Sequence, residues 1–145
     1  MVFKINISDK SGKTYKLEIE AESLIDKELN DKVNGEEIYP ELKGYELEIT
    51  GASDLAGFTV MKEVPGIGLK KILLKYGKGM HKRPKKEGKK KRSNPKPKGL
   101  KLRKTVRGKV ISPAIVQINM KVLKQGNKKL SEIFPEQNNK SEKSE

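Results

Sequence analysis

The chain lacks cysteine, has a single histidine, and is poor in aromatic residues, which make up 5% of its 145 residues. The absence of cysteine excludes disulfide frameworks, thiolate zinc sites and thiol nucleophiles, and it fits a reducing compartment such as the cytoplasm. His81 is surrounded by Gly79, Met80, Lys82 and Arg83, a cationic setting that suits a general base poorly. We therefore expect a protein that is not an enzyme and that needs no cofactor or metal.

Long hydrophobic runs are also absent from the sequence. No segment approaches the roughly 18 consecutive apolar residues of a membrane-spanning helix, and the N-terminus alternates apolar and polar residues where a signal peptide would be apolar throughout. Gly66-Ile67-Gly68 lacks the third glycine of a dinucleotide-binding fingerprint and the Gly-Lys-Ser/Thr ending of a P-loop. These features predict a soluble, cytoplasmic protein with no membrane partner and no small-molecule substrate.

The basic charge of the chain is confined to one segment. The total is +14, yet residues 1–74 carry a net charge of −4, residues 75–109 carry +16, and residues 110–145 carry +2. Such segregation is the mark of a site for a polyanion. Residues 80–99 contain no Leu, Ile, Val, Phe, Tyr or Trp, whereas a membrane surface recruits basic residues together with an apolar face. Nucleic acid is therefore the favoured partner.

Proline and glycine interrupt the basic segment and predict a long loop in place of a helix. Its arginines add planar groups that suit phosphate and base stacking. We expect the part from Lys82 to Lys109 to lack fixed structure until it binds RNA, although a disordered basic run with no specific partner remains the alternative. The predicted RNA-binding residues are Lys78, Lys82, Arg83, Lys85, Lys86, Lys89, Lys90, Lys91, Arg92, Lys96, Lys98, Lys101, Arg103, Lys104, Arg107 and Lys109.

Outside the basic segment, short alternating patterns predict strands. Residues 3–7 and 15–19 alternate around a turn at residues 9–13 and predict a β-hairpin, and residues 45–49 predict a half-buried strand that ends at Gly51. Apolar residues at 72–74, 106, 110–111 and 115–122 suggest three further strands, and residues 23–33 form a weak helical stripe. We expect an all-β fold, a small closed β-barrel within residues 1–126 that carries the basic loop 75–109. Residues 127–145 form a C-terminal extension that we expect to be disordered from about Pro135.

Two sequence blocks resemble a known family. Gly44-Tyr45-Glu46-Leu47-Glu48-Ile49-Thr50-Gly51-Ala52-Ser53-Asp54, followed by Gly57-Phe58, and Arg103-Lys104-Thr105-Val106-Arg107-Gly108 are similar to the signature blocks of the archaeal and eukaryotic small-subunit ribosomal protein S-six, e type. Ile72-Leu73-Leu74, Arg83-Pro84 and Gln117-Ile118-Asn119 agree with it too, and the resemblance runs from Val2 to Gly126. It implies a non-catalytic β-barrel in the small subunit that binds ribosomal RNA and neighbouring ribosomal proteins.

The chain departs from the family pattern in two places. Thr59-Val60-Met61 stands where Pro-Met is expected, and the long basic, serine-bearing C-terminal helix of eukaryotic members is missing. We therefore expect a short archaeal form without kinase-linked regulation. The main alternative is a free RNA-binding module or RNA chaperone on an OB-like barrel, but such barrels stack bases on exposed aromatic residues, which are scarce here. A structural protein with no RNA partner would leave the charge segregation unexplained.

Overall fold

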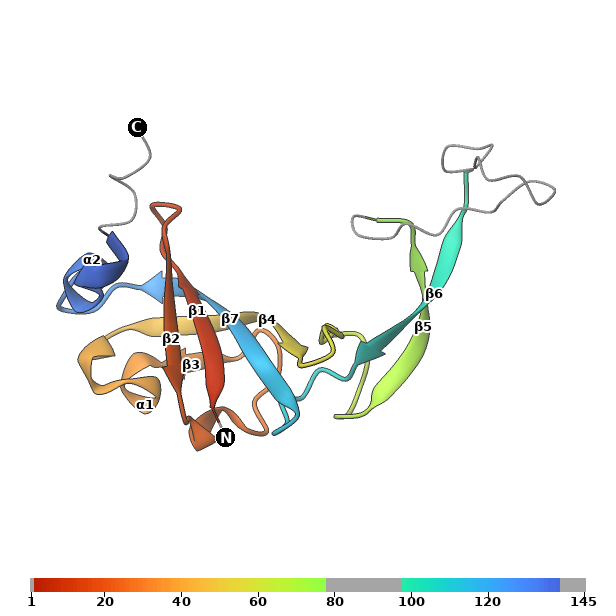
Figure 1. Ribbon diagram of the computed structural model, residues 1–145, viewed down its shortest axis with the longest axis horizontal. Coiled ribbons are helices and arrows are strands. Elements are labelled where there is room, and N and C mark those ends of the chain that lie inside the picture. The colour runs from red at the N-terminus through yellow and green to blue at the C-terminus, as the bar shows by residue number, and fades with distance from the viewer. Residues whose placement is uncertain (1, 78–97, 139–145) are drawn as a thin grey trace.

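The computed structural model describes residues 2–77 and 98–138. Within these ranges the strands form two separate sheets, one of five strands in the order β2-β1-β7-β4-β3 and one of two strands, β5 and β6. The two-stranded sheet lies apart from the rest of the molecule, at one end (Figure 1). The strands are β1 Phe3–Ser8, β2 Thr14–Ile19, β3 Lys32–Asn34, β4 Glu46–Asp54, β5 Leu69–Lys75, β6 Lys101–Arg107 and β7 Ile115–Lys124.

The N-terminal hairpin predicted from the alternating pattern is confirmed. Strands β1 and β2 pair antiparallel, with Ile7 opposite Tyr15, so the apolar residues of both strands share one face. The turn closes around Asp9, whose carboxylate accepts hydrogen bonds from the Lys10 amide at 2.7 Å and the Ser11 hydroxyl at 2.8 Å. Gly12 follows with a φ of +88°, a conformation that glycine adopts without strain.

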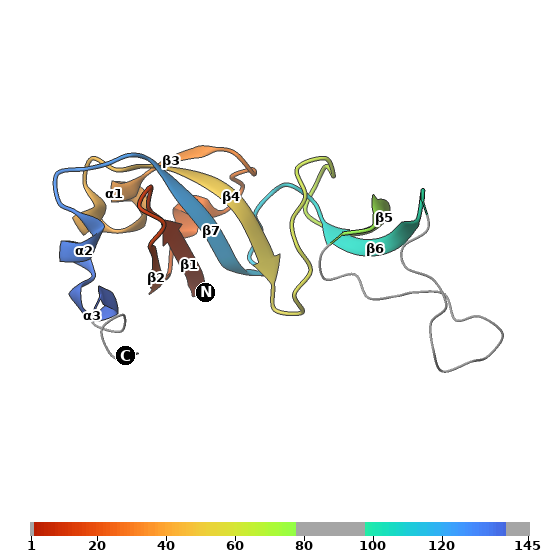
Figure 2. The same ribbon diagram turned by 90° about the horizontal axis from the view of Figure 1, so that it is seen from above.

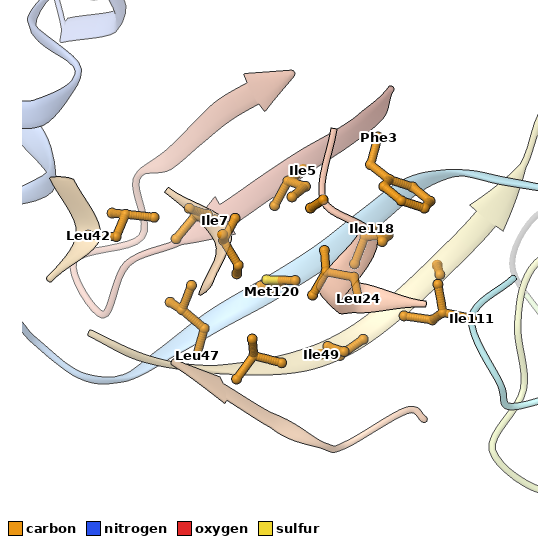
Figure 3. Packing of buried hydrophobic residues seen from close by; sticks show 14 of the residues in the cluster. Phe3, Ile5, Ile7, Leu24, Leu42, Leu47, Ile49, Ile111, Ile118 and Met120 are labelled. Atoms are coloured by element: carbon orange, nitrogen blue, oxygen red, sulfur yellow. The ribbon is translucent and has the colours of Figure 1, made fainter. Parts of the chain in front are cut away.

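The last strand, β7, lies at the centre of the five-stranded sheet. It pairs parallel with β1 and antiparallel with β4, so that Met120 lies beside both Ile7 and Ile49. The connecting segments cover the apolar face of the sheet, and Leu24 and Leu42 from two short 3-10 helices, η1 Glu22–Leu24 and η2 Pro40–Leu42, are fully buried against it (Figure 3). Burial of each such side chain stabilises the fold by roughly 1.5–3 kcal/mol relative to exposure. We call this sheet and its connections the body.

The prediction of a closed barrel is wrong. Strands β2 and β3 are the two edges of the larger sheet, and no ladder joins them in residues 2–77 and 98–138. Strand β3 is only three residues long, too short to complete a barrel wall. The β2 edge is protected in another way: the Gln137 side chain accepts a hydrogen bond from the Lys16 amide and donates one to the Lys16 carbonyl, both at 2.7 Å. The fold is therefore mostly β, but open.

The weak helical stripe at residues 23–33 does not form a continuous helix, and only the 3-10 turn η1 Glu22–Leu24 overlaps its start. Asp26 and Asn30 have positive φ angles of 66° and 70°, which break a right-handed helix. Val33 packs into the core from strand β3 instead. A single helical turn that the sequence did not predict, α1 Gly35–Ile38, follows directly.

The C-terminal segment folds further than expected. Helices α2 Leu130–Ile133 and α3 Pro135–Asn138 follow β7, where disorder from about Pro135 was predicted. Leu130 is buried in the core, and the Phe134 ring stacks on Tyr15, with ring centroids 5.8 Å apart. In the part of the chain that the structure describes, no helix has the length and apolar character needed to cross a membrane.

Candidate nucleic-acid interface

Strands β5 and β6 form a basic two-stranded ribbon that projects from the body (Figure 2). The pairing runs from Leu69 opposite Arg107 to Lys75 opposite Lys101. These two strands contain seven lysine and arginine residues and no aspartate or glutamate. We call residues 69–75 and 101–107 the cationic ribbon. An isolated hairpin is marginally stable in water, so the ribbon needs support from the body or from a partner.

Strand alternation divides the cationic ribbon into two unlike faces. Because directly paired residues share a face, one face carries Lys71, Lys75, Lys101 and Arg103, together with Leu69, Leu73, Thr105 and Arg107. We call this the basic face. The opposite face carries Lys70, Ile72, Leu74, Leu102, Lys104 and Val106. Like charges directly across a ladder, as at Lys75 and Lys101, destabilise a hairpin, and a bound polyanion would remove that cost.

The structure covers six of the predicted RNA-binding residues. Lys98 lies in an exposed turn, Lys101, Arg103, Lys104 and Arg107 lie on β6, and Lys109 follows it. The expectation that Lys82–Lys109 lacks fixed structure is therefore wrong for residues 101–107. The other predicted residues lie outside the described residues: Lys78, Lys82, Arg83, Lys85, Lys86, Lys89, Lys90, Lys91, Arg92 and Lys96.

Sequence reasoning missed three cations of the ribbon. All three lie on β5 and are exposed: Lys70 and Lys71 are opposite residues of the Arg103–Gly108 block, and Lys75 is opposite Lys101. The predicted set begins at Lys78, so it leaves out Lys70 and Lys71 of the mildly acidic residues 1–74, and also Lys75 at the start of the basic segment 75–109. Pairing the apolar run at 72–74 with the block at 103–108 would have found these lysines.

Arg107, at the root of the ribbon, is held by the body. Its Nε donates to Asp54 Oδ2 at 2.7 Å, and the two side chains are only 16% and 5% exposed. Asp54, at the end of β4, also accepts a hydrogen bond from the Phe58 amide at 2.8 Å. Burial by itself raises the pKa of the Asp54 carboxyl, but the hydrogen bonds and charge of Arg107 and the backbone amides outweigh it, so this pKa lies below its usual value. Arg107 thus fastens the ribbon to the body.

Lys109 makes a second attachment at the root. Its Nζ lies 2.7 Å from Glu28 Oε2, and its amide donates to the Val64 carbonyl at 2.7 Å. Between these two attachments the Gly108 amide donates to the Gly68 carbonyl at 3.1 Å. Arg107 and Lys109, both predicted to contact RNA, are therefore paired within the protein. No ion pair with another described residue is formed by the cations of the basic face farther from the body, Lys71, Lys75, Lys101 and Arg103.

A methyl group at Gly108 should disrupt this root. An added Cβ would lie 1.8 Å from the Gly66 carbonyl oxygen, which is backbone and cannot rotate away. We expect Gly108→Ala to destabilise the protein by about 1–3 kcal/mol through strain, measured by urea denaturation. Gly68→Ala is the matched control, since nothing lies within 4 Å of a Cβ there. Equal stability of the two variants would contradict the crowding seen at Gly108.

Acid should weaken the Asp54–Arg107 pair. Because the pKa of folded Asp54 lies below its usual value, its stabilising contribution is fully present above the unfolded pKa of about 3.9 and is lost as the pH falls through the folded pKa. The stability difference between the wild type and Asp54→Asn should therefore be constant near neutral pH and should shrink below about pH 4. Urea unfolding of both proteins at a series of pH values measures this stability difference. If the difference persisted at the lowest pH, the ionised Asp54–Arg107 pair would not be its cause.

No group of three or more His, Cys, Asp and Glu side chains could hold a metal ion in residues 2–77 and 98–138. The chemistry that the described site offers is charge, hydrogen-bond donors and a few exposed apolar side chains, without an arranged nucleophile or base. Fold and site together define an open β-sheet protein with a projecting cationic ribbon.

Comparison with known proteins identifies the family to which this β-sheet protein belongs. The family model for ribosomal protein S6e matches residues 3–96 and 93–135. Small ribosomal subunit protein eS6 of Methanococcus maripaludis strain C6 is 40% identical over 127 residues, covering 87% of this chain and 90% of the relative. The proteins of the same name from Nanoarchaeum equitans and Archaeoglobus fulgidus are 39% and 38% identical, over 93% and 92% of this chain and 91% and 96% of the relatives. The chain belongs to the ribosomal protein S6e family, as its two sequence blocks indicated.

Proposed function

We propose that this protein is a structural constituent of the small ribosomal subunit, where it binds ribosomal RNA and neighbouring ribosomal proteins. The observation that carries the RNA contact is the cationic ribbon, which presents Lys71, Lys75, Lys101 and Arg103 on one face with no acidic residue on either strand. The membership of the S6e family supports the ribosomal setting. The body acts as a rigid platform, and the ribbon with the rest of the basic segment 75–109 supplies the affinity.

The individual RNA contacts divide by position. On the basic face, Lys71, Lys75 and Lys101 neutralise phosphates, while the guanidinium of Arg103 offers a planar fork for a phosphate or a base. Arg107 and Lys109 position the ribbon and are not free for RNA, because the carboxylates of Asp54 and Glu28 hold them. The other predicted cations, at residues 78–98, belong to the same basic segment of the sequence.

A free RNA-binding module of the OB type is less well supported. Such modules stack bases on exposed aromatic rings, and none of the seven aromatic residues of this chain is exposed. Phe3, Tyr15 and Tyr45 belong to the core, and Tyr39 packs on Phe134 with ring centroids 6.5 Å apart. Tyr76, the best candidate for stacking, is half-buried.

Sedimentation of cell extract through a gradient at moderate salt tests the proposal. We expect the protein, located with an antibody, to migrate with the small subunit and to leave it after washing with concentrated salt, because phosphate contacts are screened. Its presence only in the free fraction would overturn the ribosomal assignment. The proposal includes no catalytic role, and a ribosome-bound protein of this kind would act in the cytoplasm.

A further inference from the structure

Exposed apolar side chains gather on the cationic ribbon and its approach. Among the described residues the large apolar side chains that are exposed are Val2, Leu55, Ile67, Leu69 and Leu73. Leu73 is 53% exposed and Leu69 is 49% exposed, and both lie on the basic face. Single exposed leucines are common, but two on one face of a small projecting ribbon form a contact surface.

The body does not use these leucines. Its core cluster includes no residue of β5, and the ribbon stands away from the body in both views (Figures 1 and 2). Every other position on the same face of the strands is a cation or Thr105. The occupant of this face must therefore be a polyanion that also has apolar parts, and RNA has both, in its phosphates and its base faces.

Leu73 and Arg103 are directly opposite each other in the ladder, so their Cβ atoms are about 4.5–5.5 Å apart. Leu73 offers an apolar surface, and Arg103 offers a planar cation that stacks on bases. Lys71 and Lys75 lie two residues to either side of Leu73 on the same face, about 7 Å away along the strand. A base resting on Leu73 and Arg103 would thus have its neighbouring phosphates near lysines.

From this arrangement, and resting on the RNA-binding function proposed above, we infer that the Leu73–Arg103 pair is a platform for an unpaired nucleotide of the ribosomal RNA. In a paired A-form helix the base faces are stacked and the major groove is too narrow for side chains, so a leucine there would find no apolar partner. Loops, bulges and strand ends present free base faces. The basic face therefore selects RNA with unpaired nucleotides, and its lysines add affinity without that preference.

The test compares Leu73→Thr with the wild type, using the full chain and small-subunit RNA transcribed without other proteins. Threonine is β-branched and has a high strand propensity, so the strand should persist while most of the apolar contact is removed. We expect binding to weaken about five- to tenfold, while the slope of log affinity against log salt stays unchanged, because no phosphate contact is lost. Lys71→Gln should instead lower that slope by about 0.7–0.9. Val2→Thr, at an apolar residue on the body that is 51% exposed, is the matched control and should bind normally.

A paired RNA duplex of equal length serves as competitor. The wild type should prefer the loop-containing RNA, and Leu73→Thr should lose that preference. If Leu73→Thr bound the RNA with unchanged affinity, the inference that Leu73 and Arg103 hold a nucleotide would be overturned. If that variant also failed to join the small subunit, the basic face would contact a neighbouring protein and not RNA. A lowered salt slope would also overturn it, since the leucine would then act only by placing cations. Failure of the wild type to bind the RNA at all would instead refute the proposed function.

Discussion

Replacing Asp54 by alanine should lower the free energy of unfolding by about 3 kcal/mol. The change leaves the Arg107 guanidinium, which is 16% exposed, without its carboxylate partner, and it removes the acceptor of the Phe58 amide. Breaking a buried pair costs far more than the pair contributes, because the remaining charge stays desolvated. Urea denaturation followed by circular dichroism measures the loss.

The matched control for Asp54→Ala is Glu48→Ala. Glu48, also on β4, forms an ion pair at 3.0 Å with Lys121 of the neighbouring strand β7, and Lys121 is 50% exposed. Such a surface pair contributes less than about 1 kcal/mol. If both variants lost the same stability, the Asp54–Arg107 pair would be an ordinary surface contact.

The Asp54→Ala substitution should also weaken RNA binding, even under conditions where the variant remains folded. Asp54 lies in the body and carries no charge that attracts RNA, so removing it makes the chain more basic and should strengthen a purely electrostatic contact. We expect the opposite result, weaker binding, because Arg107 would no longer fix the ribbon at the end of β4. Tighter binding by Asp54→Ala would show that the orientation of the ribbon is unimportant.

The sequence predicted local strand structure better than the arrangement of strands. Alternation at residues 3–7 and 15–19 identified the first hairpin, because a short turn leaves one pairing that keeps the apolar residues on one face. Closure into a barrel depends on contacts between residues distant in sequence, such as β2 with β3, and alternation contains no information on them. The helical stripe at 23–33 failed because positive φ angles at Asp26 and Asn30 are set by tertiary hydrogen bonds, including that from the Asn30 amide to the Ile49 carbonyl.

The candidate site shows the same limit. Counting charge along the chain located the basic segment, yet it could not separate Arg103, which is exposed on the ribbon, from Arg107, which pairs with Asp54. These two arginines are four residues apart and lie on the same face of one strand. What distinguishes them is the distance of each from the body, and only the fold reveals that distance.

Neutralising the basic face should produce the largest change in RNA binding. We expect wild-type affinity to fall by about 10³–10⁵ between 50 and 200 mM salt if roughly 6–10 phosphates are engaged. Replacing Lys71, Lys75, Lys101 and Arg103 by glutamine should weaken binding by about 10²–10³-fold at 0.15 M salt and should lower the salt slope by about 3. Titration of labelled small-subunit RNA at several salt concentrations measures both quantities.

The control removes the same charge from the body. Lys10, Lys13, Lys43 and Lys128 are exposed and lie in turns and connections of the body, away from the ribbon, and replacing all four by glutamine lowers the net charge equally. If RNA responded only to total charge, both variants would lose the same affinity and the same slope. A much larger loss for the ribbon variant would mean that the phosphates lie along the basic face, because counterions are released only where a cation and a phosphate meet.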